Sequence, residues 1–119
     1  MKTFDLIKQY KIFEKDINKK VLKVLSSGSY ILGQNVKSFE NNAREYLSAR
    51  YTVSCNSGTD ALVMSLRALN IGNNDQVITT PFTYFATSEA ISLVGATPIF
   101  ADINPHTFNI NPKKTQVQH

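Results

Sequence analysis

The sequence has little cysteine, no long apolar run, no internal repeat and no low-complexity tract. One cysteine, Cys55, cannot form a disulfide within the chain, which fits a reducing compartment. No segment approaches the roughly 18 consecutive apolar residues of a membrane span, and the N-terminal stretch MKTFDLIKQYK lacks the apolar run of a signal peptide. These absences disfavour a disulfide-stapled secreted domain and a membrane protein, and predict a cytoplasmic location.

The composition is that of an ordinary globular chain. Hydrophobic residues make up 42% and charged residues 18% of the 119 residues, so disorder throughout is not expected. The net charge of +4 comes mainly from lysines within the first 37 residues. Since no aromatic residues alternate with these lysines in a nucleic-acid-binding pattern, they are interpreted as a solvated helix face and no nucleic-acid partner is predicted.

The first third of the chain predicts two amphipathic helices. Apolar residues over Ile12–Leu25 recur at steps of three and four, and Gly28 is placed to end that helix. A second helical stripe covers Val36–Leu47 and follows the turn-prone Gly33.

The pattern then changes to alternating strands and helices. Strands are predicted over Tyr51–Cys55, Val77–Thr80 and Thr97–Ala101; a buried helix is predicted to start near Ser57, and a second helix to cover Phe82–Val94. The fold class is therefore α/β, a β-α-β-α-β segment of parallel sheet. Such a small sheet leaves open edges and an uncovered face, and the tail from Asn109 is polar, so the architecture predicts more chain than these 119 residues.

The run Ser57-Gly58-Thr59-Asp60 falls where the first predicted strand meets a helix. The first turn of a helix has unpaired N–H groups and a positive dipole end, which together favour a bound phosphate. Gly58 would allow close approach to the backbone, and Thr59 would add a hydroxyl donor. The alternative is that Ser57 only caps the helix and Gly58 only makes a turn. Asp60 would repel a phosphate unless its carboxylate turned back towards the cap.

A second candidate element, Thr79 to Tyr84, follows the next predicted strand on the same edge of the sheet. A Tyr84 ring projecting from this turn would stack on a flat heteroaromatic ligand, a contact worth about 0.5 to 1.5 kcal/mol beyond burial. The alternative is that Phe82, Tyr84 and Phe85 are aromatic residues of the core.

These residues lie in a series of motifs that, in order and spacing, resembles the start of the DegT/DnrJ/EryC1/StrS aminotransferases. The matching motifs are Asp5-Leu6 to Tyr10, Ser27-Gly28, Ile31-Leu32-Gly33, Phe39-Glu40, Asn56 to Leu62, Asp75 to Ile78, Pro81 to Tyr84, Ala86-Thr87 and Gly95 to Asp102. The resemblance covers nearly the whole chain. It implies the fold of fold-type I pyridoxal 5'-phosphate enzymes, with residues 1–119 forming part of the large, cofactor-binding domain and the small C-terminal domain lying outside them.

The family resemblance also implies roles for the candidate residues. Gly58, Thr59 and the backbone N–H of Asp60 would hold the phosphate of pyridoxal 5'-phosphate, and Tyr84 would stack on its pyridine ring. The segment Tyr30–Gly33 would lie near the active site at a subunit interface. The family acts as homodimers that transfer an amino group, usually from glutamate, to a nucleotide-linked keto sugar in amino-sugar and polysaccharide biosynthesis.

The catalytic lysine of this family is missing from the sequence. Pyridoxal 5'-phosphate catalysis needs a Schiff-base lysine and a carboxylate that pairs with the pyridinium nitrogen. None of the ten lysines stands in the family's context for that residue, so no catalytic residue is assigned. Three hypotheses follow: an inactive N-terminal fragment of an aminotransferase, a non-catalytic phosphate- or cofactor-binding module that partners a full-length relative, or a fragment of a family sugar dehydratase.

Overall fold

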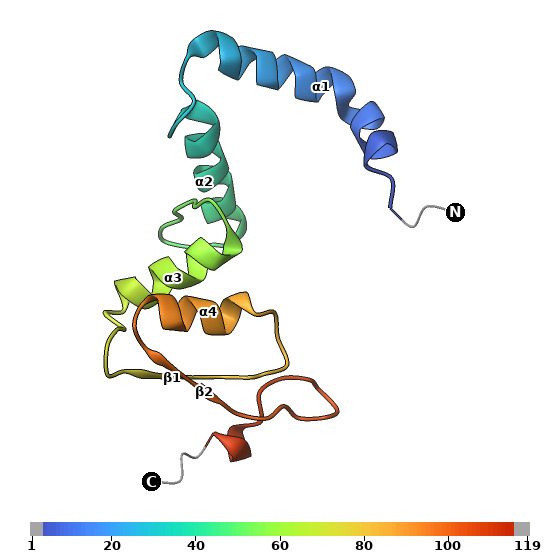
Figure 1. The fold of residues 1–119 in the computed structure, drawn as a ribbon. Coiled ribbons are helices and arrows are strands. Elements are labelled where there is room, and N and C mark those ends of the chain that lie inside the picture. The colour runs from blue at the N-terminus through green and yellow to red at the C-terminus, as the bar shows by residue number, and fades with distance from the viewer. Residues whose placement is uncertain (1–3, 116–119) are drawn as a thin grey trace. The chain divides into compact units, whose positions relative to one another are not determined.

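The computed structural model describes residues 4–115, which belong to two units, Met1–Ser54 and Cys55–His119. The first unit contains the two predicted helices, α1 (Leu6–Ser27) and α2 (Gln34–Tyr46). Asp5 caps α1 by accepting the Lys8 N–H at 3.1 Å, and Gly28 ends it in the left-handed conformation, with φ +68°. Figure 1 shows the two helices running apart from the loop that joins them.

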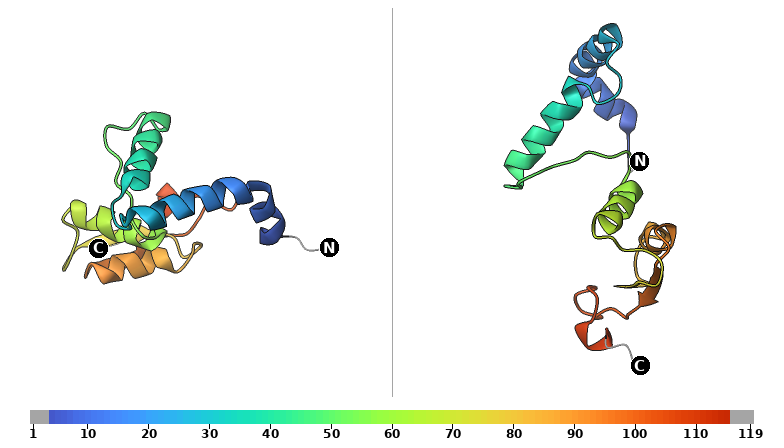
Figure 2. Two further views of the ribbon diagram at one scale, coloured as in Figure 1. Left: turned by 90° about the horizontal axis from the view of Figure 1, so that it is seen from above. Right: turned by 90° about the vertical axis from the view of Figure 1, so that its left-hand side faces the viewer.

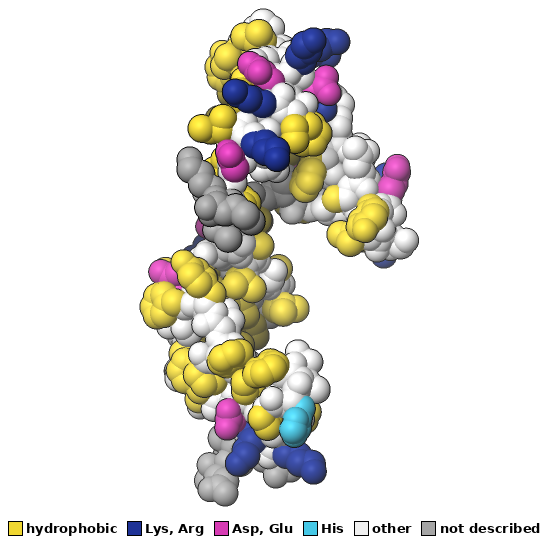
Figure 3. Space-filling model, turned by 90° about the vertical axis from the view of Figure 1, so that its right-hand side faces the viewer, with side chains coloured by type: hydrophobic (Ala, Val, Ile, Leu, Met, Phe, Trp, Pro, Cys, Tyr) yellow, Lys and Arg dark blue, Asp and Glu magenta, His cyan; other side chains and the backbone are white. Residues whose placement is uncertain are grey.

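The apolar stripes of α1 and α2 have no partner among residues 4–54. None of these residues is buried, and Phe13 and Phe39 are 53% and 62% exposed. Apolar side chains lie at the surface among charged ones on the face drawn in Figure 3. The helices are therefore defined by local signals, namely their apolar periodicity and, for α1, its caps, and not by a core of their own. No helix within residues 4–115 has both the length and the apolar character needed to cross a membrane.

The strand predicted over Tyr51–Cys55 is not formed, and that prediction is wrong. The segment is irregular, because no described strand runs alongside it to complete a hydrogen-bond ladder. Its best-defined anchor is a side chain of α2: the Ser54 N–H and hydroxyl donate to Glu40 Oε1 at 2.9 and 2.8 Å. These two hydrogen bonds, the backbone one first, lower the pKa of the Glu40 carboxyl from its ordinary value.

The second unit is a small α/β assembly. Its elements are α3 (Gly58–Ala68), β1 (Gln76–Thr79), α4 (Ala86–Leu93) and β2 (Thr97–Phe100). The two strands pair in parallel, with Gln76 opposite Thr97 and Thr79 opposite Phe100, so the predicted parallel pairing is confirmed for two strands of the expected three. Helix α4 packs against both strands and against α3 (Figure 1).

The core of this unit is built from small side chains. Its buried residues are Thr79, Ala86, Ala90, Ile91, Ala96 and Ala101. Alanines along α4 let its backbone approach the strands and α3 closely. Because few apolar atoms are removed from water, the hydrophobic contribution of this core is modest.

Two further predictions for this unit are corrected. Helix α3 is not buried, because α4 is the only described element that packs on it, and its Leu62 and Met64 remain 41% and 48% exposed. Helix α4 begins at Ala86 instead of Phe82, since Pro81 and the Phe82 N–H bond to Thr80 Oγ1 hold a bend there.

The tail also has more structure than its polar sequence suggests. Ile110 forms an antiparallel bridge with Ile103, and a short 3₁₀ helix, η1 (Pro112–Lys114), is capped by Asn111 Oδ1, which accepts the Lys113 N–H at 3.1 Å. The rest of the predicted polar tail, residues 116–119, lies outside the described residues.

Candidate functional site

Chain reversals place both candidate elements at one edge of the second unit. The chain reverses direction between α3 and β1, again between β1 and α4, and again between α4 and β2. The N-terminal ends of α3 and α4 therefore lie at the edge where the parallel strands end, and the views in Figures 1 and 2 agree on this. In open α/β sheets this is the edge where ligands bind.

Ser57 and Asp60 form a reciprocal cap at the start of α3. The Ser57 Oγ accepts the Asp60 N–H at 3.1 Å, and the Ser57 hydroxyl donates to Asp60 Oδ2 at 2.8 Å. The predicted capping role is confirmed, and the Asp60 carboxylate turns back to the cap, as a phosphate site requires. The cap also uses the Asp60 N–H, one of the three groups assigned to the phosphate by the family resemblance.

The residues between Ser57 and Asp60 suit an anion. Helical geometry gives the N–H groups of Gly58 and Thr59 no acceptor within the helix. A Cβ atom built on Gly58 would meet nothing within 4 Å, so a ligand atom can approach its backbone freely. Thr59 is half-buried at the same turn. These features fit a phosphate group, which brings several acceptor oxygens and a charge that the helix dipole favours.

The loop after β1 places its aromatic rings at the same edge. Tyr84 is 82% exposed and is available to a ligand, whereas the alternative that these aromatics are core residues is wrong: Phe82 is 63% and Phe85 72% exposed. The sequence did not predict the partner of Phe82, which is Phe108 from the loop after β2. Their rings stack with centroids 5.8 Å apart and an interplanar angle of 27°.

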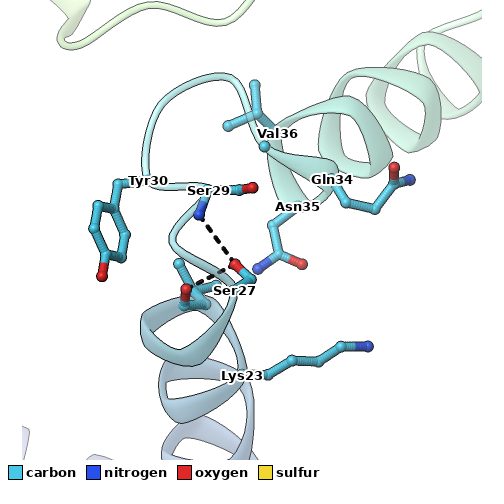
Figure 4. A pocket seen from close by; sticks show the side chains of 9 residues that line it. Lys23, Ser27, Ser29, Tyr30, Gln34, Asn35 and Val36 are labelled. Atoms are coloured by element: carbon cyan, nitrogen blue, oxygen red, sulfur yellow. Dashed lines mark hydrogen bonds between the residues drawn. The ribbon is translucent and has the colours of Figure 1, made fainter.

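The first unit has a pocket of its own at the corner between its helices. It has a volume of about 270 Å³ and is lined by residues of both helix ends and the loop between them, Lys23 and Tyr30 among them (Figure 4). Part of the predicted Tyr30–Gly33 segment lines it. The Tyr30 hydroxyl donates to the Leu25 carbonyl at 3.1 Å, and the Ser27 hydroxyl accepts the Ser29 N–H at 3.2 Å.

The segments that form this edge provide neither a lysine nor a cluster of metal-binding side chains. Residues 55–112 contain no lysine in the sequence. Among residues 4–115, no group of three or more His, Cys, Asp and Glu side chains is placed to hold a metal ion. The edge therefore offers anion donors and an aromatic ring, and the lysines of this unit, Lys113 and Lys114, lie in η1.

Parallel strands joined through a helix, with the N-termini of α3 and α4 at their carboxyl edge, define this unit as part of an α/β domain. The sequence pattern of the DegT/DnrJ/EryC1/StrS aminotransferase family matches residues 11–117. The chain therefore belongs to that family, and the predicted family and fold class are confirmed.

Relatives with known names and structures agree with this assignment. The chain is 41% identical to the UDP-2-acetamido-2-deoxy-3-oxo-D-glucuronate aminotransferase of Pseudomonas aeruginosa, over 92% of this chain and 30% of that protein. A DegT DnrJ EryC1 StrS aminotransferase structure from Brucella abortus matches with a TM-score of 0.86 and 40% identity, over 93% of this chain and 30% of the other.

A third relative is known with the cofactor. A sugar aminotransferase structure from Streptococcus pneumoniae, in its PLP form, matches with a TM-score of 0.75 and 38% identity, over 78% of this chain and 24% of the other. The chain thus spans about 30% of the length of the first two relatives and less of this one.

Proposed function

We propose that this chain contributes part of the cofactor site of a sugar aminotransferase. The reaction is the transfer of an amino group from an amino acid, glutamate being the expected donor, to a nucleotide-linked keto sugar. In this proposal Gly58, Thr59 and Asp60 hold the phosphate of pyridoxal 5'-phosphate, and Tyr84 lies against its ring. The 119 residues are part of the large domain of a homodimeric enzyme whose remaining large-domain segments and small domain lie outside this sequence.

The observation that carries the proposal is the open first turn of α3. Gly58 and Thr59 present N–H groups without intrahelical acceptors, and the backbone of Gly58 faces open space at the edge where α/β sheets generally bind ligands. The Asp60 N–H joins them when the Ser57 hydroxyl rotates away from it, a small change in one exposed side chain. Tyr84, exposed on the neighbouring loop, supplies a flat surface for the ring.

The chain's own part in the chemistry is binding and orientation. Pyridoxal 5'-phosphate, when bound, supplies an electron sink for the bond changes at the amino carbon. The α3 amides fix the phosphate end, and the Tyr84 ring limits rotation of the heterocycle about that end. Because residues 55–112 contain no lysine, we propose that the chain by itself binds the cofactor without transaminating.

A titration of the chain with pyridoxal 5'-phosphate and with inorganic phosphate tests this proposal. Thr59→Ala removes one charge-assisted hydrogen bond, which is worth about 1.5 to 3 kcal/mol, so both affinities should fall by about tenfold to a hundredfold. Thr59→Ser keeps the hydroxyl and should retain most of the binding. Thr97→Ala makes the same kind of truncation at the opposite edge of the sheet and should change neither affinity.

A second candidate is a non-catalytic cofactor-binding module that partners a full-length relative. The same open turn, combined with the lack of lysine in residues 55–112, favours it. The two candidates differ in what restores activity. Addition of a polypeptide carrying the missing two thirds of the family fold should restore transamination if this chain is part of an enzyme. A pure binding module would take up the cofactor and leave that polypeptide inactive.

A further inference from the structure

The loop after β2 is a closed, hydrogen-bonded structure that contacts the loop carrying Tyr84 through the ring of Phe108. Ile103 pairs with Ile110 in an antiparallel bridge. The Asn104 N–H donates to the Asn109 carbonyl, and the Phe108 N–H to the Asn104 carbonyl, both at 2.8 Å. This loop is thus held by its own backbone, and it carries Phe108 in a fixed position.

Phe108 has an unusual backbone conformation for a bulky residue. Its φ of +58° lies in the left-handed region that favours glycine and asparagine. Such a conformation costs energy and persists where the surrounding structure determines it, as the backbone hydrogen bonds of this loop do here. The ring that this conformation presents is the one that stacks on Phe82.

Phe82 belongs to the loop that carries Tyr84. The other hydrogen bonds of this loop are short in range: the Phe82 N–H donates to Thr80 Oγ1 at 3.1 Å, and the Thr87 N–H to the Tyr84 carbonyl at 3.1 Å. The aromatic stack joins this loop to a second, independently bonded loop. The stack therefore fixes the segment between β1 and α4 relative to the loop after β2, which the short-range hydrogen bonds of that segment do not do.

We propose that Phe108 is a positioning residue: by stacking on Phe82 it holds the Tyr84 loop in the conformation that receives a heteroaromatic ligand. The inference rests on the proposed function, since it assigns Tyr84 to the ring of the cofactor. Phe108 itself does not touch the ligand. Its effect is confined to the ring-binding part of the site and leaves the phosphate-binding turn of α3 unchanged.

Phe108→Gly tests the contribution of the aromatic ring alone. Glycine adopts φ +58° without strain, so the backbone conformation is kept while the stack on Phe82 is lost. In the full 119-residue chain without ligand, chymotrypsin cleavage after Tyr84, followed by mass spectrometry, should be about two to ten times faster in the variant, the factor that corresponds to one aromatic pair. Asn70→Gly is the matched control: Asn70 also has φ +58°, in the turn between α3 and β1, and its replacement should leave the rate unchanged. Equal rates in wild type and Phe108→Gly would overturn the proposal.

Ligand titrations provide the second readout. In Phe108→Gly the affinity for pyridoxal 5'-phosphate should fall by about two- to tenfold, while the affinity for inorganic phosphate stays that of the wild type. Equal losses for both ligands would show general destabilisation and would also overturn the proposal. If wild-type chain binds neither ligand, the proposed function fails, and the cleavage experiment still decides whether Phe108 orders the loop.

A double variant tests whether Phe108 acts on the Tyr84 loop through its contact with Phe82. Phe82→Ala should accelerate cleavage after Tyr84 by a similar factor, and Phe82→Ala combined with Phe108→Gly should add nothing further, because either substitution removes the same contact. Full additivity of the two effects would place the action of Phe108 elsewhere and contradict the proposed stack.

Discussion

The two units of the chain are built in opposite ways. Residues 4–54 form two helices with no buried residue, whereas every buried residue of the described chain belongs to residues 55–115. The first unit has regular structure without a core, and the second has a small core around a two-stranded sheet. Local signals alone thus suffice to specify helices, while burial in this chain depends on contacts between distant segments.

The largest expected effect concerns the exposed apolar side chains on the helices of the first unit. The exposed apolar stripe of α1 should cause the chain to self-associate at micromolar concentration, measured by sedimentation velocity. Replacing Phe13 and Ile17 together by Gln should lower the association constant by about tenfold or more. Replacing Lys15 and Lys19 by Gln on the same helix is the control and should not lower it. A monomeric wild-type chain that unfolds cooperatively would contradict this prediction.

A pair of glycine substitutions tests where packing matters. Gly95 has φ +88°, and an added Cβ would collide with the Asn73 side chain, whereas Gly28 has φ +68° in open space. Gly95→Ala should destabilise β1, α4 and β2 by about 1 to 3 kcal/mol, from backbone strain plus the displacement of the exposed Asn73 side chain. Gly28→Ala should cost about 1 to 2 kcal/mol and affect only the end of α1.

Hydrogen exchange by residue range distinguishes these two outcomes. Gly95→Ala should accelerate exchange across residues 76–100, while Gly28→Ala should accelerate it only in the last turns of α1. Equal and local effects at both glycines would mean that the second unit has no cooperative core.

Helix caps should matter less than packing. Ser57→Ala removes the acceptor of the Asp60 N–H and should destabilise α3 by about 1 kcal/mol. Asp5→Ala removes the corresponding cap of α1, again by about 1 kcal/mol, but its effect should remain within α1 because that helix supports no core. Hydrogen exchange in α4 and β1 distinguishes the two variants. Ser57→Ala should accelerate exchange there and Asp5→Ala should not; acceleration by Asp5→Ala alone would contradict the difference between the two units.

The smallest expected effect is a pH dependence in the first unit. Because hydrogen bonds from Ser54 lower the pKa of Glu40 in the folded chain, its contribution is fully present above the ordinary value of 4.5 and is lost as pH falls through the lowered value. Protection of the Ser54 N–H should therefore decline as pH drops below 4.5. Glu40→Gln should remove that dependence, and an unchanged profile in the variant would exclude Glu40 as its source.

Local features of the sequence predicted much of this fold. The two leading helices, the cap at Ser57, the helix start at Gly58 and the reversal at Gly95 all depend on signals within a few residues. The edge shared by α3 and the β1–α4 loop followed from the alternation of strands and helices. The failures are non-local: Tyr51–Cys55 has strand composition without a described neighbouring strand, and α3 has core composition without a cover.

The candidate site shows the same division. The candidate anion-binding turn at Gly58 and Thr59 was predictable because one turn of helix defines it, and its assignment to pyridoxal 5'-phosphate came from the family resemblance. The stack of Phe108 on Phe82 was not predictable, because it joins two loops and requires a positive φ at a phenylalanine. Nothing in the neighbouring residues of Phe108 signals either feature.

The most direct test of the account is pyridoxal 5'-phosphate binding by the chain, followed by borohydride reduction and mass mapping. We predict saturable binding that Thr59→Ala weakens at least about tenfold, together with release of the cofactor on dialysis and no specific modified lysine after reduction. Absence of saturable binding, or binding indifferent to Thr59→Ala, would contradict the assignment of the α3 turn. Reductive attachment of the cofactor to one specific lysine would contradict the claim that this chain binds the cofactor without a catalytic lysine.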